Sequence, residues 1–283
     1  MATKIFERQD SSTKVTVAVF QEQAPAPAAN FTDFPVELPS GEDTATMVVI
    51  GGGATGALTP QGALLTASYP NDDLSAWLVS SKDHEESNPH RLIGFAIGLK
   101  ITGMTRAQLQ SAVKVVSKTS NRVAHPQATA SAPAGFLLVG GGFRVNGLAG
   151  AGNLATASFP EFSNSWTARS KDHHLSSPAT IDAFAICLQQ RLPAGTIGRG
   201  DNSAESPLSQ HVEATTRLDE EFALTVIGAE VRWTPPGSLL WRLEPTHRQG
   251  QGVTGQGVTA GAKDHVEPSL ATVKAWAIGI RLV

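Results

Sequence analysis

Short apolar runs, bounded by Gly, Pro, Asn and Asp, recur along the whole chain, and this pattern is typical of β-strands joined by tight turns. Within residues 93–99 every second residue is a large apolar one, which is the period of a strand with one buried face. Only residues 105–116 have a helical composition, and because that segment ends in β-branched residues it predicts no more than a short helical turn. The pattern therefore predicts an all-β fold. About four strands are expected in the first third of the chain, at residues 46–50, 63–69, 76–80 and 92–100, with a weaker fifth upstream.

The apolar runs belong to three diverged copies of one module. Three blocks recur in order: a strand that leads into glycine, a segment that ends in Lys-Asp-His, and an apolar closing strand. The first copy reads MVVIGGGATG, ALLTASYPNDDLSAWLVSSKDH and PHRLIGFAIGLKI; the second reads FLLVGGGFRVNG, GNLATASFPEFSNSWTARSKDHH and PATIDAFAICLQQRL; the third reads ALTVIGAEVRW, GQGVTAGAKDH and PSLATVKAWAIGIRLV. The histidines of the three triplets, His84, His173 and His265, are 89 and 92 residues apart. We therefore expect a single domain with three internal repeats, at about 12–104, 105–192 and 193–283.

One module of about four strands buries little apolar surface, because an isolated small sheet exposes one apolar face. Three sheets packed around a common axis would cover those faces, so the repeats predict a pseudo-threefold β-prism. Equivalent strand positions are then expected for Val49, Ile50, Leu138, Val139, Val226 and Ile227. In the closing strands Ile93, Phe95, Ile97 and Leu99 should correspond to Ile181, Ala183 or Phe184, and Ile186, and then to Val273, Trp276, Ile278 and Ile280, within one residue of register.

Composition and charge narrow the possible partners and the compartment. With 22 basic and 25 acidic residues the net charge is only -3, so no general attraction to nucleic acid or to anionic lipid is expected. The polar start of the chain and the lack of a long apolar stretch predict no signal peptide and no membrane insertion by this chain alone. We expect synthesis in the cytoplasm, with release by lysis or dedicated secretion left open. Cys187 lies in an apolar run and is expected to be a buried, inert thiol.

Lys-Asp-His is the most repeated polar signature of the chain. Polar residues retained in all three copies need a structural or a functional reason. A Trp precedes the Lys by five positions in the first two modules, whereas the third module has Val258 there. The candidate ligand-binding residues are therefore Lys82, Asp83, His84, Lys171, Asp172, His173, Lys263, Asp264, His265, Trp77 and Trp166.

Three interpretations of the triplet stay open. In the first, Asp caps the turn after a strand while Lys and His pair with it or with loop carbonyls. In the second, each triplet is a ligand site in which carboxylate and imidazole bind sugar hydroxyls or a lipid head group beside a stacking aromatic. In the third, the three histidines converge on one metal ion, although their spacing lacks the local pattern of zinc motifs, and we predict neither a metal nor another cofactor. The distance between the three imidazoles separates a shared axial site from three peripheral loops.

The chain contains no recognisable catalytic motif. The glycine triplets 51–53 and 140–142 lack the Lys-Ser/Thr ending and the following helix of a phosphate loop, and only one glycine is shared by the third copy. A bulge or tight packing between sheets explains them better. There is neither a Gly-x-Ser-x-Gly elbow nor a His-Glu-x-x-His motif, and although a Ser-His-Asp triad can assemble from residues far apart in sequence, nothing here predicts one. We therefore favour a protein that is not an enzyme.

The succession of GGG strand, S-x-P turn, Trp-x4-Lys-Asp-His and AFAIGL-type closing strand resembles the triplicated β-prism-like targeting domains of some bacterial membrane-attack-complex/perforin proteins. The resemblance covers the chain from about Met47 onward and implies a recognition role. It implies nothing about pore formation by this chain, because no perforin domain and no amphipathic inserting segments are present. The expected function is thus non-catalytic recognition of a cell-surface glycan or related polar ligand through the Lys-Asp-His loops, with oligomerisation possible. The alternatives are a structural or assembly scaffold and, third, a metal-dependent enzyme with a shared His site.

Overall fold

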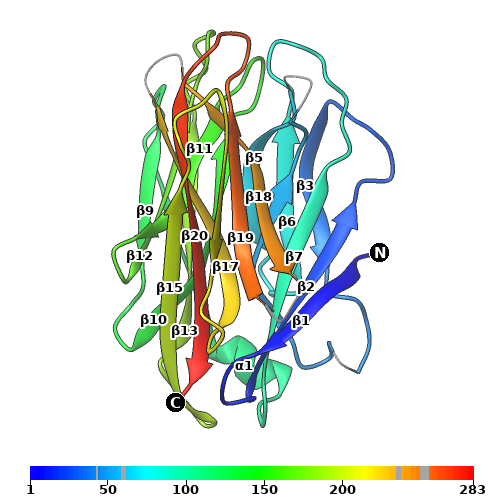
Figure 1. Ribbon diagram of the computed structural model, residues 1–283, viewed down its shortest axis with the longest axis vertical. Coiled ribbons are helices and arrows are strands. Elements are labelled where there is room, and N and C mark those ends of the chain that lie inside the picture. Colours follow the sequence, from blue (N-terminus) through cyan, green and yellow to red (C-terminus); the bar gives the residue numbers. More distant parts are fainter. Residues whose placement is uncertain (43, 59–61, 234–236, 249–254) are drawn as a thin grey trace.

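The computed structural model describes residues 1–283 except 43, 59–61, 234–236 and 249–254. It is an all-β protein, as predicted, whose strands run along the long axis of the molecule (Figure 1). The strands form three sheets, and every strand pair within them is antiparallel among the described residues. The first sheet has the order β1 (Thr3–Gln9), β2 (Val15–Gln23), β7 (Ile93–Ile101), β4 (Val48–Thr55), β18 (Leu239–Arg248), β19 (Gly255–Lys263), β16 (His211–Arg217).

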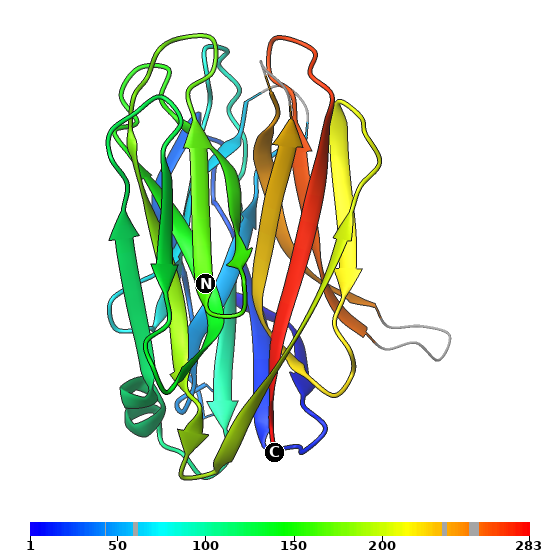
Figure 2. The ribbon, with the colours of Figure 1, turned by 90° about the vertical axis from the view of Figure 1, so that its left-hand side faces the viewer.

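The other two sheets combine strands in a similar way. The second has the order β3 (Asn30–Glu37), β6 (Ala76–Lys82), β5 (Leu64–Pro70), β10 (Phe136–Asn146), β13 (Thr180–Gln189), β8 (Val113–Thr119). The third has the order β14 (Arg191–Leu192), β15 (Gly195–Glu205), β20 (Ala271–Leu282), β17 (Ala223–Trp233), β11 (Leu154–Glu161), β12 (Ser165–Lys171), β9 (Gln127–Ser131). Each sheet therefore joins strands of two different repeats, whereas the sequence had suggested one sheet for each repeat (Figure 2).

Apart from β1 and the two-residue β14, each repeat contributes six strands to two sheets in the described part of the chain, not about four to one. The expected runs correspond to β4, β5, β6 and β7 in the first repeat, and the weaker upstream segment is β2. The sequence did not predict β3, β9 and β16. Each lies at the edge of its sheet, where β3 pairs with β6, β9 with β12 and β16 with β19. Such strands expose one face and carry many polar residues, as in His211–Arg217, where buried and exposed residues alternate strictly. Their apolar runs are consequently too short to recognise.

The inner strands β4, β10 and β17 carry the glycines, and the register explains why only one glycine is common to all three. Each inner strand has a bulge at the same place, just before the residue that pairs with Ile97, Ile186 or Ile278. This register aligns Val49 and Ile50 with Leu138 and Val139, as predicted. The third copy was misaligned by two residues, because Leu224 and Thr225 occupy these places instead of Val226 and Ile227.

In the corrected register the shared glycines are Gly53, Gly142 and Gly228. At each of them a strand of another repeat passes close: a Cβ would clash with the carbonyl oxygen of Leu243 at Gly53 and with that of Ser68 at Gly142, and it would lie 3.2 Å from that of Ser158 at Gly228. The other glycines of these strands are not shared by all three repeats. Gly51, where a Cβ would meet the carbonyl oxygen of Thr225, corresponds to Val226 in the third repeat. The glycines are therefore architectural, as the sequence suggested.

The closing strands keep the predicted register within the one residue that the prediction allowed, and only their first position is shifted by that residue. Phe95 is equivalent to Phe184 and Trp276, and Ile97 to Ile186 and Ile278. The first position, Ile93, corresponds to the polar residues Asp182 and Lys274 rather than to Ile181 and Val273.

The short helix predicted from residues 105–116 is present as α1 (Arg106–Ala112), at the lower end of the molecule in Figure 1. Thr105 caps it, since its side chain accepts a hydrogen bond from the amide of Gln108 while the Gln108 side chain accepts one from the amide of Thr105. The helix ends where Val113 begins β8, because the β-branched residues from there on favour an extended chain. No helix in the described part of the chain is long and apolar enough to cross a membrane. Cys187 is buried, as expected, and burial raises the pKa of its thiol to about 11.

Candidate functional site

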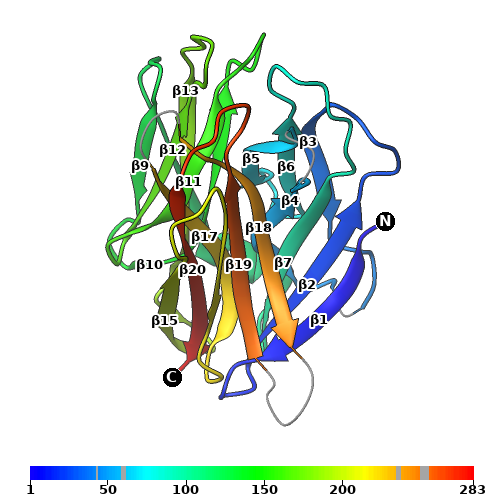
Figure 3. The ribbon, with the colours of Figure 1, turned by 45° about the horizontal axis from the view of Figure 1, so that its top comes forward.

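The three Lys-Asp-His triplets lie together at the upper end of the molecule, in the loops that follow β6, β12 and β19 (Figures 1 and 3). Each Lys is the last residue of its strand and each Asp and His begins the loop. The residue after each His has a positive φ, 58° at Glu85, 60° at His174 and 64° at Val266. The same sharp turn therefore follows the triplet in every repeat, although none of these residues is glycine.

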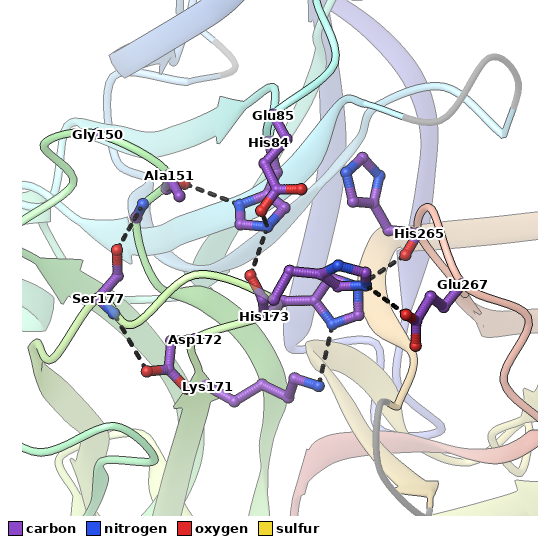
Figure 4. A network of polar contacts seen from close by, with 12 residues as sticks. His84, Glu85, Gly150, Ala151, Lys171, Asp172, His173, Ser177, His265 and Glu267 are labelled. Atoms are coloured by element: carbon purple, nitrogen blue, oxygen red, sulfur yellow. Dashed lines mark hydrogen bonds and ion pairs between the residues drawn. The ribbon is translucent and has the colours of Figure 1, made fainter.

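The three histidines converge, which is the outcome that the sequence associated with one shared site. Their ring centroids are 5.6 Å apart between His84 and His173, 5.0 Å between His84 and His265, and 5.8 Å between His173 and His265. All are buried, with exposed fractions of 0%, 3% and 1% in chain order. The Nε2 atom of His84 donates to the carbonyl of His173 at 2.8 Å, and that of His173 to the carbonyl of His265 at 2.7 Å (Figure 4). The imidazoles thus link consecutive repeats.

Two lysines of the triplets, Lys82 and Lys263, also reach across repeats. The ammonium group of Lys82, in the first repeat, donates to the carbonyls of Gly150 at 2.8 Å and Ala151 at 2.6 Å in the second. The ammonium group of Lys263, in the third repeat, donates to the carbonyls of Ala57, Leu58 and Gly62 in the first. Lys171 donates to Nδ1 of His173 at 3.2 Å. Carbonyl oxygens of a loop in another repeat thus satisfy the buried ammonium groups of Lys82 and Lys263.

The aspartates, in contrast, make their contacts within their own repeat. Each accepts a hydrogen bond from the backbone amide five residues later, that of Asn88, Ser177 or Ser269. Each also lies near one histidine of its own repeat: His90, at 3.7 Å from Asp83; His125, at 3.3 Å from Asp172; and His211, at 2.9 Å from Asp264. The aspartate side chains are only 9%, 15% and 13% exposed. They fix the loop, as a turn-capping carboxylate does.

Burial sets the ionisation of this cluster. It lowers the pKa of Lys171 and of Lys263 to about 8, and it lowers the pKa of Lys82 as well, because an ammonium group loses hydration there. It lowers the pKa of His173 to about 4, against the opposing effect of the hydrogen bond to His265, and the neighbouring Lys171 lowers it further. Nδ1 of His173 accepts a hydrogen bond from the Lys171 ammonium group while its Nε2 donates one, so the geometry requires a neutral ring.

These contacts match the first of the three interpretations, in which Asp caps the turn while Lys and His pair with it or with loop carbonyls. A ligand loop was expected to expose its imidazole, whereas all three imidazoles are buried. A metal centre would need ring nitrogens directed at one ion, but both nitrogens of His84 and Nε2 of His173 are directed at backbone carbonyls, and Nδ1 of His173 faces the Lys171 ammonium group. No group of three His, Cys, Asp or Glu side chains that could hold a metal ion occurs in the described ranges. We call the nine Lys-Asp-His residues the apical clamp.

The two tryptophans of the predicted ligand site are core residues. Trp77 and Trp166 have no exposed surface, and each indole nitrogen donates to a serine hydroxyl, that of Ser68 at 2.8 Å and that of Ser158 at 2.9 Å. Neither ring offers a face to a ligand in solution. The Trp77 ring lies against Gly52 and that of Trp166 against Gly141, where a Cβ would clash. In the third repeat Val258 takes the place of the tryptophan and Ile227 takes the place of the glycine beside it, and both are buried. A smaller residue at the first position thus accompanies a larger one at the second.

A second candidate site lies at the seams, where a strand of one repeat meets an inner strand of the next. The first seam joins β5 to β10, the second β11 to β17 and the third β18 to β4. At the first seam the rings of Tyr69 and Phe184 stack, with centroids 5.2 Å apart and planes 13° apart, and the Arg144 guanidinium lies over Tyr69. The hydroxyl of Tyr69 donates to Asp33 at 2.9 Å.

The other seams have different side chains at equivalent positions. The second seam has Phe159 and Trp276, with centroids 6.3 Å apart and the Lys274 ammonium 4.0 Å from the Trp276 ring. The third has Glu244 in place of Tyr69. None of these seam residues was predicted from the sequence. The aligned segments TASYP and TASFP could have revealed two of them, Tyr69 and Phe159, because both have an aromatic residue at the same place.

Fold and clamp together define an all-β repeat protein in which three sheets are each shared by two repeats and one end is fixed by buried polar residues. No protein-family model matches the chain, and no curated protein matches it.

Proposed function

We propose that this chain is a non-catalytic recognition protein that binds a neutral sugar of a cell-surface glycan in a groove at the first seam. The observation that carries the proposal is a groove of about 510 Å³ in which the Tyr69–Phe184 pair lies among polar side chains. The polar residues of its wall include Asn71, Asp72, Gln110, Lys114, Ser117 and Arg144. An apolar aromatic surface beside hydrogen-bonding groups suits a sugar, which has apolar C–H faces and a rim of hydroxyls.

Charge favours a neutral or weakly charged ligand here. Arg144 is already bound to Asp182, with 3.2 Å from Nε and 3.0 Å from Nη2 to the carboxylate, so its charge is largely compensated. Burial of Tyr69 raises the pKa of its phenol, so the hydroxyl stays protonated; its hydrogen is donated to Asp33, and its oxygen can accept. The Asn71 side chain bonds Ser75 and Ala76 within its own turn, so the further hydrogen bonds to a sugar would come from the Ser117 hydroxyl and from Gln110, whose Nε2 donates to the carbonyl of Asp73.

In this proposal the three sheets form a pseudo-threefold β-prism and the apical clamp holds the repeats in place, while the ligand binds elsewhere. The resemblance to targeting domains of perforin-like proteins supports the same role. A lipid head group and a purely structural or assembly role are the competing possibilities.

A glycan array followed by isothermal titration tests the proposal. We expect the wild-type chain to bind a neutral glycan and Phe184→Ala to lose at least tenfold in affinity. Lys114→Ala should weaken binding several-fold, whereas Lys118→Ala, on the same strand but outside the groove wall, should not. Thermal unfolding would verify that each variant is folded. An array with no positive glycan, or a folded Phe184→Ala variant that binds as tightly as the wild type, would contradict the proposal.

A further inference from the structure

A groove of about 390 Å³ lies at the second seam, where β11 and β12 of the second repeat meet β17 of the third. Two arginines line it, Arg169 from β12 and Arg232 from β17, and each donates to one oxygen of the Glu230 carboxylate. Lys171 borders it as well, but its ammonium group donates to His173 and belongs to the apical clamp. The two arginine side chains are 34% and 54% exposed, so a ligand from solution can reach them.

Arg169 is held in a fixed position in this groove. Its Nε donates to Oε1 of Gln127 at 3.0 Å, and its Nη1 donates to Oε1 of Glu230 at 3.0 Å. Its guanidinium lies over the Phe159 ring, 5.1 Å from the ring centroid. A guanidinium carries about five N–H groups, and these are the two hydrogen bonds that the Arg169 side chain makes among the described residues. The other N–H groups are therefore available to an acceptor on a ligand.

Positive charge is in excess around the groove. Arg232 donates to Oε2 of Glu230 at 3.4 Å and to Oε2 of Glu205 at 3.3 Å. Lys274 pairs with Glu230 across β17 and β20. Three cations, Arg169, Arg232 and Lys274, thus share these two carboxylates. An anionic ligand would supply the balancing charge.

The other seams show that the fold does not require the two arginines. The strand register places Ser80 and Gly261 at the position of Arg169. It places Asn146, at the first seam, at the position of Arg232. Partly exposed ion pairs also contribute little to stability. A ligand therefore accounts for the arginines of the second seam better than folding does.

We infer that this groove binds the carboxylate of an acidic sugar. The planar fork of a guanidinium matches a carboxylate, and Glu230 already shows a carboxylate bound by both arginines. Gln127, whose Oε1 accepts from Arg169, can donate its side-chain amide to a sugar hydroxyl, and the volume of the groove suits a sugar ring. This seam belongs to the third sheet and the Tyr69–Phe184 groove to the second, so the two sites are separate and differ in the charge that they select.

Isothermal titration of the full chain with a hexasaccharide that contains glucuronic acid tests this inference. The comparison ligand is the same hexasaccharide with every carboxylate reduced to a hydroxymethyl group. We expect the carboxylated form to bind at least tenfold more tightly, and added salt to weaken it by screening. Arg169→Ser and Arg232→Asn copy the residues of the first seam, so both should fold, and each should lose at least fivefold in affinity. Arg217→Ser removes an exposed arginine of β16 outside the groove and should bind as the wild type does.

Equal binding of the carboxylated and the reduced hexasaccharide would overturn the inference. A folded Arg169→Ser variant that binds like the wild type, or an Arg217→Ser variant that loses as much as Arg169→Ser, would do so as well. A sulfated hexasaccharide that binds more tightly than the carboxylated one would contradict the assignment to a carboxylate. Phe184→Ala, which removes the neutral-sugar site, should leave this binding unchanged, so the two sites can fail separately. Thermal unfolding identifies any variant that has lost its structure.

Discussion

The apical clamp and the seams occupy the same places in every repeat, yet one is uniform and the other is not. Every repeat has Lys, Asp and His in the clamp: lysine and histidine side chains bond carbonyls of a neighbouring repeat, and each aspartate fixes its own loop. The seams differ from one to the next, from an aromatic pair with Arg to a glutamate in place of the tyrosine. In this protein the repeated residues make structural contacts, whereas the side chains at the seams diverge, and in the function we propose the specificity would come from those diverged positions.

A single cross-strand pair beside the seams illustrates how far the divergence goes. The pair is Thr55 and Ile93 in the first repeat, Arg144 and Asp182 in the second, and Glu230 and Lys274 in the third. The two charged pairs are reversed in sign, so attraction across the strands is kept while the charge presented on each strand changes.

The largest effect should come from removing the clamp carboxylates. With Asp83, Asp172 and Asp264 all changed to Ala, each loop loses the acceptor for its buried amide, at about 2 kcal/mol for each loop. The sum of about 6 kcal/mol is comparable with the whole stability of an ordinary domain. We expect the triple variant to be unfolded or strongly destabilised in urea. A triple variant with wild-type stability but no ligand binding would assign the clamp to recognition instead.

A second test transfers the core pair of the third repeat into the second. Gly141→Ile should clash with the Trp166 ring and Trp166→Val should leave a cavity, and we expect each to destabilise the fold by about 3 kcal/mol. The double variant copies Ile227 and Val258 and should recover at least half of the summed loss. Urea denaturation of the three variants measures this coupling. Strict additivity would show that the two positions are not a packing unit.

A third test concerns acid. The pKa of His173 is about 4 in the folded chain and about 6.5 when unfolded, so between these values the unfolded state binds more protons. The stability contribution is therefore complete above pH 6.5 and is lost as the pH falls toward 4, by up to about 3 kcal/mol. Urea midpoints at pH 7, 5.5 and 4.5 should fall accordingly. His173→Gln should start lower but show a flatter decline over this range, and an unchanged slope would contradict the prediction.

The smallest effect should be at the seam. Arg144→Glu should destabilise the chain by about 1 kcal/mol, because Asp182 then faces a like charge. Arg144→Glu combined with Asp182→Lys copies the third repeat and should regain part of this loss, though Thr119 and Asn146 lose the carboxylate as their acceptor. Thermal melting monitors stability. The same double variant should lose glycan binding, since the groove changes while the clamp does not.

Much of the fold could be predicted from the sequence, because strand periodicity and repetition are properties of the chain itself. The triplets, the buried Cys187, the short helix and the register of Phe95 with Trp276 follow from local pattern. The third inner strand was misaligned because several apolar residues in a row around Val226 allow a shift of two without exposing any of them. Sharing of sheets between repeats could not be predicted, since a strand pattern does not specify which neighbour completes the sheet.

The candidate site was harder to predict than the fold. Retained polar residues suggested binding, but a carboxylate that caps a turn and one that binds a ligand look alike in sequence. Trp77 and Trp166 suggested stacking faces, and only the nearby glycines Gly52 and Gly141 reveal why they are buried.

Because each sheet is shared by two repeats, its strands are not all available at the same time during synthesis. The first sheet holds β1, β2, β4 and β7 together with β16, β18 and β19, so one half is synthesised early and the other last (Figure 3). While the ribosome is still translating the second repeat, the outer edge of β4 has no partner and its apolar face has no cover. The early strands therefore depend on late ones, and we expect this protein to complete folding only after release. Nascent chains held at residue 200 should be cut by protease at sites that resist cleavage in the finished molecule.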